Sequence, residues 1–308
     1  MISVIISTYN RAESLGPALK SFWKQEGIGN FEVLVVDNNS TDQTKEVVEA
    51  AKAESGGKLK YAFQPVQGKS HALNMAVGLA KGDILVFTDD DVIADSRWLA
   101  NMTSAFEKYS CDGVGGRVLP QYPGNTPQWI KDNPRKIAGV VVISDFGEET
   151  KPFEESMERL IGANYAFKKK ILVDNGGFRT DLGPGQGTTG EDTELVWRLL
   201  KKGKKIFYCG QALVWHPVDL ERLKWKPLAN WHIQQGRFSA RQEYEDSSKH
   251  FVYLNGVPRY LFAGVVRDIF GLVTHPFDRL GFLDSYRALF RKIGMIKEYR
   301  AIQMRKKT

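Results

Sequence analysis

Residues 84–91 form the run ILVFTDDD, in which four apolar residues and a threonine are followed directly by three aspartates. Short, nearly all-apolar runs of this length are typical of strands that are buried on both faces of a sheet. Open α/β sheets bind ligands at the carboxyl ends of such strands. Because adjacent carboxylates repel one another, a cation near Asp89, Asp90 and Asp91 would stabilise the turn. The run therefore predicts either a cation-binding sheet edge or a solvated acidic turn that caps the next helix.

The chain before this run alternates strand-like and helix-like segments, which is typical of a mostly parallel sheet with helices on both faces. The second predicted strand ends at Asp37, so the same edge rule places Asp37 near the aspartates, although DNNSTD (residues 37–42) is also an ordinary turn sequence. Thr41 is expected to cap the helix that follows. The predicted strands are residues 3–8, 31–36, 59–63 and 84–88, and the predicted helices are residues 15–23, 41–54 and 70–80.

The second half of the chain contains weaker signals. Glycines and prolines between residues 113 and 127 predict that no long element forms there. Further on, a helix is predicted over residues 191–202 and strands over 205–209 and 212–215. From about residue 218 the composition changes, and a basic amphipathic segment at 284–296 predicts a helical region. We therefore expect an α/β fold with a helical C-terminal region.

Two further features could carry chemistry. Glu191 and Asp192 lie at a predicted helix N-terminus behind a glycine-rich loop, which suits a general base but also matches ordinary helix capping. His216 could bind a metal ion, although a lone histidine is more often structural. Residues 185–190 match G-x-G-x-x-G, but no convincing strand precedes them, so we interpret residues 183–190 as a loop that closes over a ligand.

The charge of the chain limits its partners. The 308 residues include 43 lysines and arginines against 36 aspartates and glutamates, a net charge of +7. This mild excess suits a phosphate-bearing ligand or an anionic membrane surface. A nucleic acid is not an expected partner, because acidic motifs line the predicted ligand edge. The two cysteines lie far apart and form no metal or redox motif, which favours a reducing cytoplasm.

Taken in order, these features of residues 1–217 resemble an inverting glycosyltransferase of the GT-A fold, family 2. In this resemblance Leu73 stands where the family often has arginine, and Lys69 or His71 is expected to replace that cation. The stretches that carry the resemblance are VIISTYNR (4–11, first strand and nucleotide-binding turn), VVDNNSTD (35–42, second strand and base-reading aspartate), GKSHALNMA (68–76, in place of G-x-x-x-A-R-N), FTDDD (87–91, metal-binding D-x-D), GED (190–192, base motif) and His216 (a further metal ligand).

The resemblance implies transfer of a sugar from a nucleoside-diphosphate sugar, usually a UDP-sugar, to a hydroxyl of a glycan or lipid-linked acceptor. It implies that Asp192 is the base, oriented with the acceptor by Glu191, and that one in-line displacement inverts the anomeric carbon. It also implies Mn²⁺ or Mg²⁺ bound by Asp89, Asp91 and His216. The implied donor-binding residues are Thr8, Tyr9, Asn10, Arg11, Asp37, Lys69, Asp89 and Asp90.

The same comparison suggests how the chain is divided. We expect a nucleotide-sugar-binding half (1–115), an acceptor-binding half with the base (116–217) and a helical region (218–308). The basic, aromatic C-terminal region predicts contact with an anionic membrane, as a lipid-linked acceptor would require. Helices that only pack on the catalytic domain are an equally good interpretation. We accordingly expect a cytoplasmic protein, either free or peripheral on the inner face of the cell membrane.

Three other functions stay open at this point. A nucleotidyltransferase shares a related sheet and a metal-binding aspartate, but the sequence after the first strand, TYNRAESLG, has a single glycine where that class has a glycine-rich basic loop. A catalytically inactive nucleotide-sugar-binding protein would not need both the acidic triplet and the Glu191–Asp192 pair. A dehydrogenase would rest on the G-x-G-x-x-G match alone.

Overall fold

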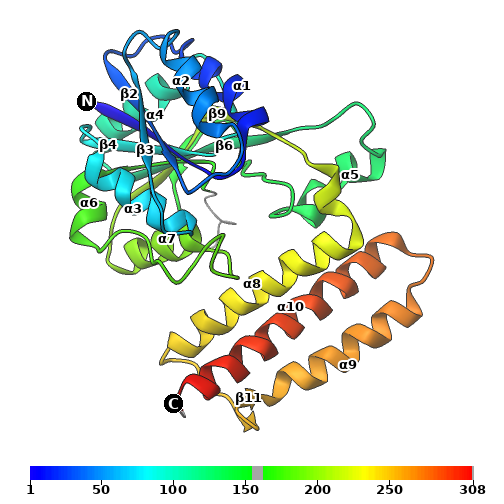
Figure 1. Cartoon of the computed structure of the whole chain (residues 1–308). Helices are drawn as coiled ribbons and strands as arrows, with labels where there is room; N and C mark the ends of the chain where they lie inside the picture. Colours follow the sequence, from blue (N-terminus) through cyan, green and yellow to red (C-terminus); the bar gives the residue numbers. More distant parts are fainter. Residues whose placement is uncertain (155–161, 307–308) are drawn as a thin grey trace. The chain divides into compact units, whose positions relative to one another are not determined.

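The chain divides into two compact units, which Figure 1 shows with their helices and strands labelled. A computed structural model describes residues 1–154 and 162–306. Unit 1 comprises Met1–Thr126, Val141–Gln186 and Glu191–Val218, and unit 2 comprises Pro127–Val140, Gly187–Gly190 and the residues from Asp219 onward.

Unit 1 is built on one mixed sheet with the strand order β3-β2-β1-β4-β8-β6-β9-β5, and β7 pairs with β9. The four N-terminal strands are parallel to one another, and β6 is parallel to β9, as predicted for a mostly parallel sheet. The strands are β1 (Ile2–Thr8), β2 (Phe31–Asp37), β3 (Leu59–Phe63), β4 (Ile84–Thr88), β5 (Ile93–Ala94), β6 (Gly113–Gln121), β7 (Thr150–Pro152), β8 (Asn164–Lys168) and β9 (Ile206–Pro217).

Helices cover both faces of this sheet, which confirms the predicted layers (Figure 1). Because side chains alternate along a strand, Val4 and Ile6 join the core under α1 and α4, whereas Ile5 joins the core under α3 and α7. The helices of unit 1 are α1 (Ala12–Phe22), α2 (Thr44–Lys52), α3 (Lys69–Leu79), α4 (Trp98–Tyr109), α6 (Lys169–Asp174) and α7 (Glu191–Lys201).

The prediction that no long element forms at residues 113–127 is wrong, because β6 spans Gly113–Gln121. Its glycines provide space for neighbouring side chains. A Cβ at Gly113 would lie 2.5 Å from the ring of Phe167, and one at Gly116 would lie 2.2 Å from the side-chain nitrogen of Asn164. Glycine marks a close approach here rather than a break, which a single sequence does not distinguish.

The two strands predicted over 205–209 and 212–215 are in fact the single strand β9. Gly116 pairs with Cys209 but the next residue, Arg117, pairs with Leu213, so residues 210–212 form a bulge on β9. The prediction that Thr41 caps the second helix is also wrong. The backbone N–H of Thr44, the first residue of α2, donates to Oδ1 of Asp42 at 3.0 Å.

Unit 2 contains the predicted helical C-terminal region, and it also includes a short hairpin. Two glycines allow α8 and α10 to approach closely: a Cβ at Gly236 would lie 1.9 Å from the carbonyl oxygen of Arg291, and one at Gly294 would lie 2.0 Å from that of Ile233. Among the described residues, no helix is both long enough and apolar enough to cross a bilayer. The elements are α5 (Gln128–Asp132), η1 (Pro134–Ile137), η2 (Leu220–Leu223), α8 (Trp225–Glu245), β10 (Tyr253–Leu254), β11 (Val257–Pro258), α9 (Arg259–Thr274) and α10 (Arg279–Arg305).

A buried ion cluster holds α10 to α8. Glu298 is completely buried, and its carboxylate accepts from Nε of Arg237 at 2.7 Å and from Nε of Arg241 at 2.8 Å. Burial raises the pKa of Glu298, but the two arginines lower it by more, so the net shift is downward. The cluster therefore stabilises the folded chain above the ordinary carboxyl range, and this contribution is lost as the pH falls through the lowered pKa.

We predict that Glu298→Gln lowers the free energy of unfolding by about 3–5 kcal/mol, because it removes the buried negative charge that pairs with the buried Arg241 and the partly buried Arg237. Urea unfolding followed by far-UV circular dichroism measures the effect. Glu13→Gln is the matched control, since Glu13 is exposed in α1. A loss for Glu298→Gln that is no larger than that of the control would show that the cluster contributes little.

Candidate active site

Three potential metal ligands meet beyond the end of β4. Nε2 of His216 lies 3.2 Å from Oδ1 of Asp91 and 3.7 Å from Oδ2 of Asp89. The sheet register brings them together, because β5 follows the aspartates and its Ile93 pairs with Trp215, the residue before His216. One ligand atom from each of the three side chains lies within 4.8 Å of the others. The long strand β9 thus delivers a histidine to a turn more than a hundred residues earlier in the chain.

The hydrogen bonding of His216 favours metal binding. Its Nδ1 lies 2.9 Å from the carbonyl oxygen of Pro217, and because a carbonyl only accepts, Nδ1 carries a proton. The lone pair of Nε2 therefore faces the two carboxylates. Burial lowers the pKa of His216, but Asp89 and Asp91 raise it by more, so the net pKa is above the ordinary value. A proton and a divalent cation are alternative occupants of Nε2.

The donor set fits a divalent cation. Carboxylate oxygens are the ligands that Mg²⁺ and Mn²⁺ prefer, and an imidazole nitrogen suits Mn²⁺ better than Mg²⁺. Within the part of the chain that the structure describes, the residues placed to share one ion are Asp89, Asp91 and His216, so Asp90 stands outside the group. Asp90 is buried, and burial, together with the charges of Asp91 and Asp89, raises its pKa to about 6. Its predicted contact with the donor stays a prediction.

Lys69 supplies a cation beside this cluster. It is the first residue of α3, and its Nζ lies 2.7 Å from Oδ1 of Asp89. Leu73, at the position where the resemblance led us to expect arginine, is instead only 2% exposed and belongs to the core. Burial lowers the pKa of Lys69, but Asp89 and Glu191 raise it by more, so the lysine is held in its charged form.

The turn before Lys69 is fixed by Asn38, a residue to which we assigned no role from the sequence. Asn38 is buried; its Nδ2 donates to the carbonyl of Val66 at 2.7 Å and its Oδ1 accepts from the backbone N–H of Gly68 at 2.8 Å. Gly68 has φ of +135°, a conformation that favours glycine. No local sequence signal indicates this role, because both backbone partners lie about 30 residues later in the chain.

The ends of β1 and β2 form one connected turn region. Oδ1 of Asp37 accepts from the backbone N–H of Ser40 and Oδ2 accepts from the hydroxyl of Tyr61, each at 2.9 Å. Oδ1 of Asn10 accepts from the N–H of Thr41 at 2.8 Å, which joins the two loops. Thr8 and Asp37 are buried, whereas the predicted donor-binding residues Tyr9, Asn10 and Arg11 are exposed.

Glu191 and Asp192, the two acids that include the predicted general base, are the first residues of α7. Oδ2 of Asp192 accepts from the backbone N–H of Gly162 at 2.8 Å, and its Oδ1 accepts from that of Thr193 at 2.7 Å. Glu191 is buried, and burial together with the charge of Asp192 raises its pKa to about 7. Adjacent carboxylates in such different surroundings are suited to different roles.

The loop that precedes this pair is anchored to α3 at its start. The N–H of Lys69 donates to the carbonyl of Pro184 at 3.1 Å, and the hydroxyl of Ser70 donates to that of Leu182 at 3.0 Å. Gly183 has φ of +97°, and a Cβ there would lie 2.9 Å from a carboxylate oxygen of Glu191. Closure of residues 183–190 over a ligand stays a prediction.

The candidate metal ligands, the cation of Lys69 and the acid pair converge within unit 1. Asp89, Glu191 and Asp192 all raise the pKa of Lys69 by their charge, which requires all three carboxylates to lie near its amine. The structure thus brings Lys69, Asp89, Asp91, His216, Glu191 and Asp192 into one region at the carboxyl edge of the sheet. Such an edge is where open α/β sheets bind ligands.

Asn164 holds the bulge that precedes His216. Its Nδ2 donates to the carbonyls of Arg117 on β6 at 2.9 Å and of Ala212 on β9 at 2.8 Å, and its Oδ1 accepts from Nε1 of Trp98 at 2.8 Å. Asn164 therefore uses both of its amide donors on the backbones of β6 and β9, and its amide oxygen bonds to α4. The bulge sets which residues of β9 reach the carboxyl edge.

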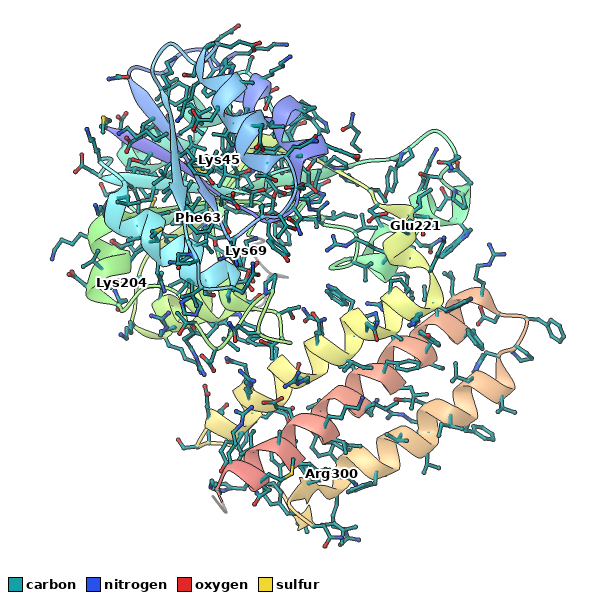
Figure 2. All side chains as sticks on the ribbon, in the orientation of Figure 1. Lys45, Phe63, Lys69, Lys204, Glu221 and Arg300 are labelled. Carbon is teal, nitrogen blue, oxygen red and sulfur yellow. The ribbon has the colours of Figure 1, made fainter. Side chains whose placement is uncertain are left out.

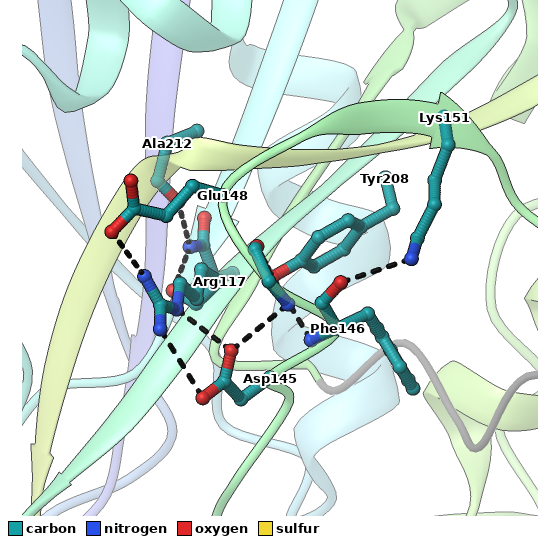
Figure 3. A network of polar contacts seen from close by, with 9 residues as sticks. Arg117, Asp145, Phe146, Glu148, Lys151, Tyr208 and Ala212 are labelled. Carbon is teal, nitrogen blue, oxygen red and sulfur yellow. Dashed lines mark hydrogen bonds and ion pairs between the residues drawn. The ribbon is translucent and has the colours of Figure 1, made fainter.

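A polar network lies beside this bulge (Figure 3). Figure 3 shows the guanidinium of Arg117 between two acids, and its Nε donates to Asp145 at 2.8 Å. The Tyr208 hydroxyl accepts from the N–H of Phe146 at 3.2 Å and donates to the carbonyl of Gly147 at 2.9 Å. These contacts tie the segment between η1 and β7 to β6 and β9, so the network supports the sheet rather than forming a second site.

The sequence pattern of the family described as glycosyl transferase family 2 matches residues 3–176, more than half of the chain. The chain belongs to this family. The matched region contains the acidic turn after β4 and the lysine that begins α3. Family membership makes the chain a glycosyltransferase.

Two curated relatives and one solved structure resemble this glycosyltransferase over about two thirds or more of its length. It is 24% identical to glucosyl-dolichyl phosphate glucuronosyltransferase from Haloferax volcanii, over 76% of this chain and 75% of that protein. It is 29% identical to GalNAc(5)-diNAcBac-PP-undecaprenol beta-1,3-glucosyltransferase from Campylobacter jejuni, over 68% of this chain and 62% of that protein. The mannosyltransferase PcManGT from Pyrobaculum calidifontis, solved with GDP-Man and Mn²⁺, has the same fold, with a TM-score of 0.57 at 20% identity over 97% of this chain and 75% of that one.

Proposed function

We propose that this glycosyltransferase is a metal-dependent, inverting enzyme. It moves a sugar from a nucleoside-diphosphate sugar to a hydroxyl of a lipid-linked or glycan acceptor, and the donor that we expect is a UDP-sugar. The observation that carries the proposal is the convergence of Asp89, Asp91 and His216 with the cation of Lys69 and the acid pair that begins α7. A leaving diphosphate needs positive charge and an acceptor hydroxyl needs a base, and this region offers both.

The donor would lie along the carboxyl edge of the sheet. We assign Asp37 to the base, because a carboxylate oxygen accepts from the ring N–H of uracil or guanine. Lys69 would face the diphosphate, and its positive charge would offset part of the diphosphate's negative charge. A cation held by Asp89, Asp91 and His216 would neutralise the charge that develops on the departing nucleoside diphosphate.

Asp192 is proposed as the base of a single displacement. It takes the proton of the acceptor hydroxyl while that oxygen forms a bond to the anomeric carbon, and the bond from that carbon to the diphosphate oxygen breaks with its electron pair leaving on the diphosphate. Because attack and departure occur on opposite sides of the carbon, the anomeric configuration inverts. The two backbone N–H bonds to Asp192 hold its carboxylate in place, and Glu191 orients the acceptor or the base.

A lipid-linked acceptor is supported by the relatives. One is named for acting on glucosyl-dolichyl phosphate and another for acting on an undecaprenol-linked oligosaccharide. The substrate of such an enzyme is held at a membrane, so we also propose that this chain works at an anionic membrane surface. The basic, aromatic residues of unit 2 support this location.

We predict that the purified chain releases a nucleoside diphosphate from one donor of a panel of UDP-, GDP- and dTDP-sugars, and that EDTA abolishes the release. The screen is run with and without Mn²⁺, and water serves as the acceptor. A parallel assay with NAD(P) tests the alternative that the chain is a dehydrogenase. Metal-independent release would contradict the proposed cofactor. Failure of every donor to bind in calorimetry would contradict the proposed function itself.

A further inference from the structure

The helix α9 packs in unit 2 through a narrow face of small and charged residues. A Cβ at Gly264 would lie 2.4 Å from the side chain of Lys292, and one at Gly271 would lie 2.4 Å from the hydroxyl of Ser285, both on α10. Asp268, between these glycines, is buried and its carboxylate pairs with Lys292. Residues 264, 268 and 271 recur at helical spacing, so this face is committed to α10.

The other face of α9 is apolar and exposed. Val266 is 68% exposed, Phe270 67%, Val273 71% and Phe277, just beyond the helix, 100%. The spacing of four and three residues places Val266, Phe270 and Val273 on one side of the helix, and Phe277 follows the end of the helix. Figure 2 shows side chains of α9 extending away from α10 on this side. We call this surface the α9 strip; its members are Val266, Ile269, Phe270, Val273 and Phe277.

The exposed charges within residues 251–277 are positive. Between residues 251 and 277 the exposed charged side chains, histidine aside, are those of Arg259 and Arg267. Asp268 is the single acid in that range, and it is buried against Lys292 with Nε of Arg267 3.5 Å from it. Asp278, which directly follows the strip, is an exposed acid, and its carboxylate accepts from the N–H of Leu280 at the start of α10. The strip thus combines an apolar surface with a border in which two arginines outnumber one acid.

We propose that the α9 strip is a membrane-docking surface that inserts in the plane of an anionic bilayer, with Phe270 and Phe277 as its principal anchors. A contiguous exposed apolar surface signals an interaction site. The net positive charge of this border is complementary to anionic headgroups, which is the pattern of a helix that lies in the interface. The 16 residues of α9 would extend about 24 Å along the surface, which fits a helix lying in the membrane plane.

This inference rests on the membrane location in the proposed function and assigns that location to particular residues. A chain held by the α9 strip meets acceptors whose lipid is anchored in the same bilayer, so the search for an acceptor is confined to two dimensions. The strip belongs to unit 2, whereas Asp89, Asp91, His216 and the acid pair belong to unit 1. Binding to vesicles and turnover of a water-soluble donor are therefore separate measurements.

The test is co-sedimentation of the full chain with phosphatidylcholine vesicles that contain about 30% phosphatidylglycerol, compared with vesicles of phosphatidylcholine alone. We expect clear binding to the anionic vesicles and at least tenfold less to the neutral ones. Phe270→Ser with Phe277→Ser should lower binding about tenfold or more, because two aromatic anchors are lost. Arg259→Gln with Arg267→Gln should lower binding about fivefold for each arginine removed.

The matched control is Leu79→Ser with Val173→Ser, which removes two exposed apolar side chains from unit 1 and should change binding less than about twofold. Thermal melts verify that every variant folds, and soluble-donor turnover should be equal in all of them. Equal vesicle binding by wild type and the phenylalanine variant would overturn the proposal. So would self-association in ultracentrifugation that the phenylalanine variant abolishes, because a second copy would then cover the strip. Vesicle binding without any donor binding would refute the proposed function and leave the strip standing.

Discussion

Asp192→Asn is expected to lower the release of nucleoside diphosphate about 10²- to 10⁴-fold while changing donor affinity less than about twofold. An amide has almost the shape of a carboxylate but cannot take a proton from an attacking hydroxyl. Both carboxylate oxygens of Asp192 accept from backbone N–H groups, those of Gly162 and Thr193. The asparagine can keep one of these bonds, so the first turn of α7 should stay in place.

The control for this prediction lies on the same helix. Glu194→Gln removes a buried carboxylate whose partner is Arg198, with Nε at 2.8 Å, and changes no proposed base. We expect its turnover to stay within about threefold of wild type even where its melting temperature falls. Donor binding is measured by calorimetry and turnover by diphosphate release. If Asp192→Asn loses binding and turnover in parallel, or loses no more turnover than Glu194→Gln, then Asp192 is not the base.

Asp91→Ala is expected to weaken Mn²⁺ binding more than about 100-fold, because it removes a proposed metal ligand. Loss of a residue that only hydrogen-bonds to a metal ligand already lowers metal affinity about 10- to 100-fold. Its Oδ1 lies 3.2 Å from Nε2 of His216, so an ion between them would lose one of its three protein ligands. Electron paramagnetic resonance of free Mn²⁺ gives the affinity directly. Activity should fall with metal occupancy and recover partly at high Mn²⁺.

The neighbouring carboxylate provides the control for Asp91. Asp90 lies in the same turn but outside the group that can share an ion among the described residues. Asp90→Asn should therefore weaken Mn²⁺ binding less than about tenfold, through charge alone. Equal affinity in wild type and Asp91→Ala would remove Asp91 from the metal site. Equal losses in the two variants would mean that the triplet acts as a diffuse acidic patch.

The parts of the fold that could be predicted are those specified by local pattern. The strand ending in Thr88 and the strand ending in Asp37 are short and almost wholly apolar, and their lengths, parallel pairing and edge position follow from that alone. By contrast, β6 was missed because Gly113 and Gly116 are required by side chains of a strand about 50 residues later. A glycine that makes room and a glycine that breaks a strand look the same in one sequence.

The candidate site divides in the same way. The acidic turn, the acid pair and His216 could be named, since each ends or begins a predicted element. Their convergence depends on the bulge in β9 and on the pairing of Ile93 with Trp215, which no local pattern specifies. Asn38 and Asn164 were missed because their bonds reach backbone atoms about 30 and 50 residues away, and nothing near an asparagine in the sequence reveals such partners.

One titration tests most directly whether the metal ligands and the diphosphate site form a single active centre. UDP is titrated into the wild-type chain by calorimetry, once with saturating Mn²⁺ and once with EDTA. Because an ion between Asp89, Asp91 and His216 would contact the diphosphate, we predict binding at least about tenfold tighter with Mn²⁺, and UDP should tighten Mn²⁺ binding by the same factor. Equal UDP affinity with and without the metal would contradict a shared centre.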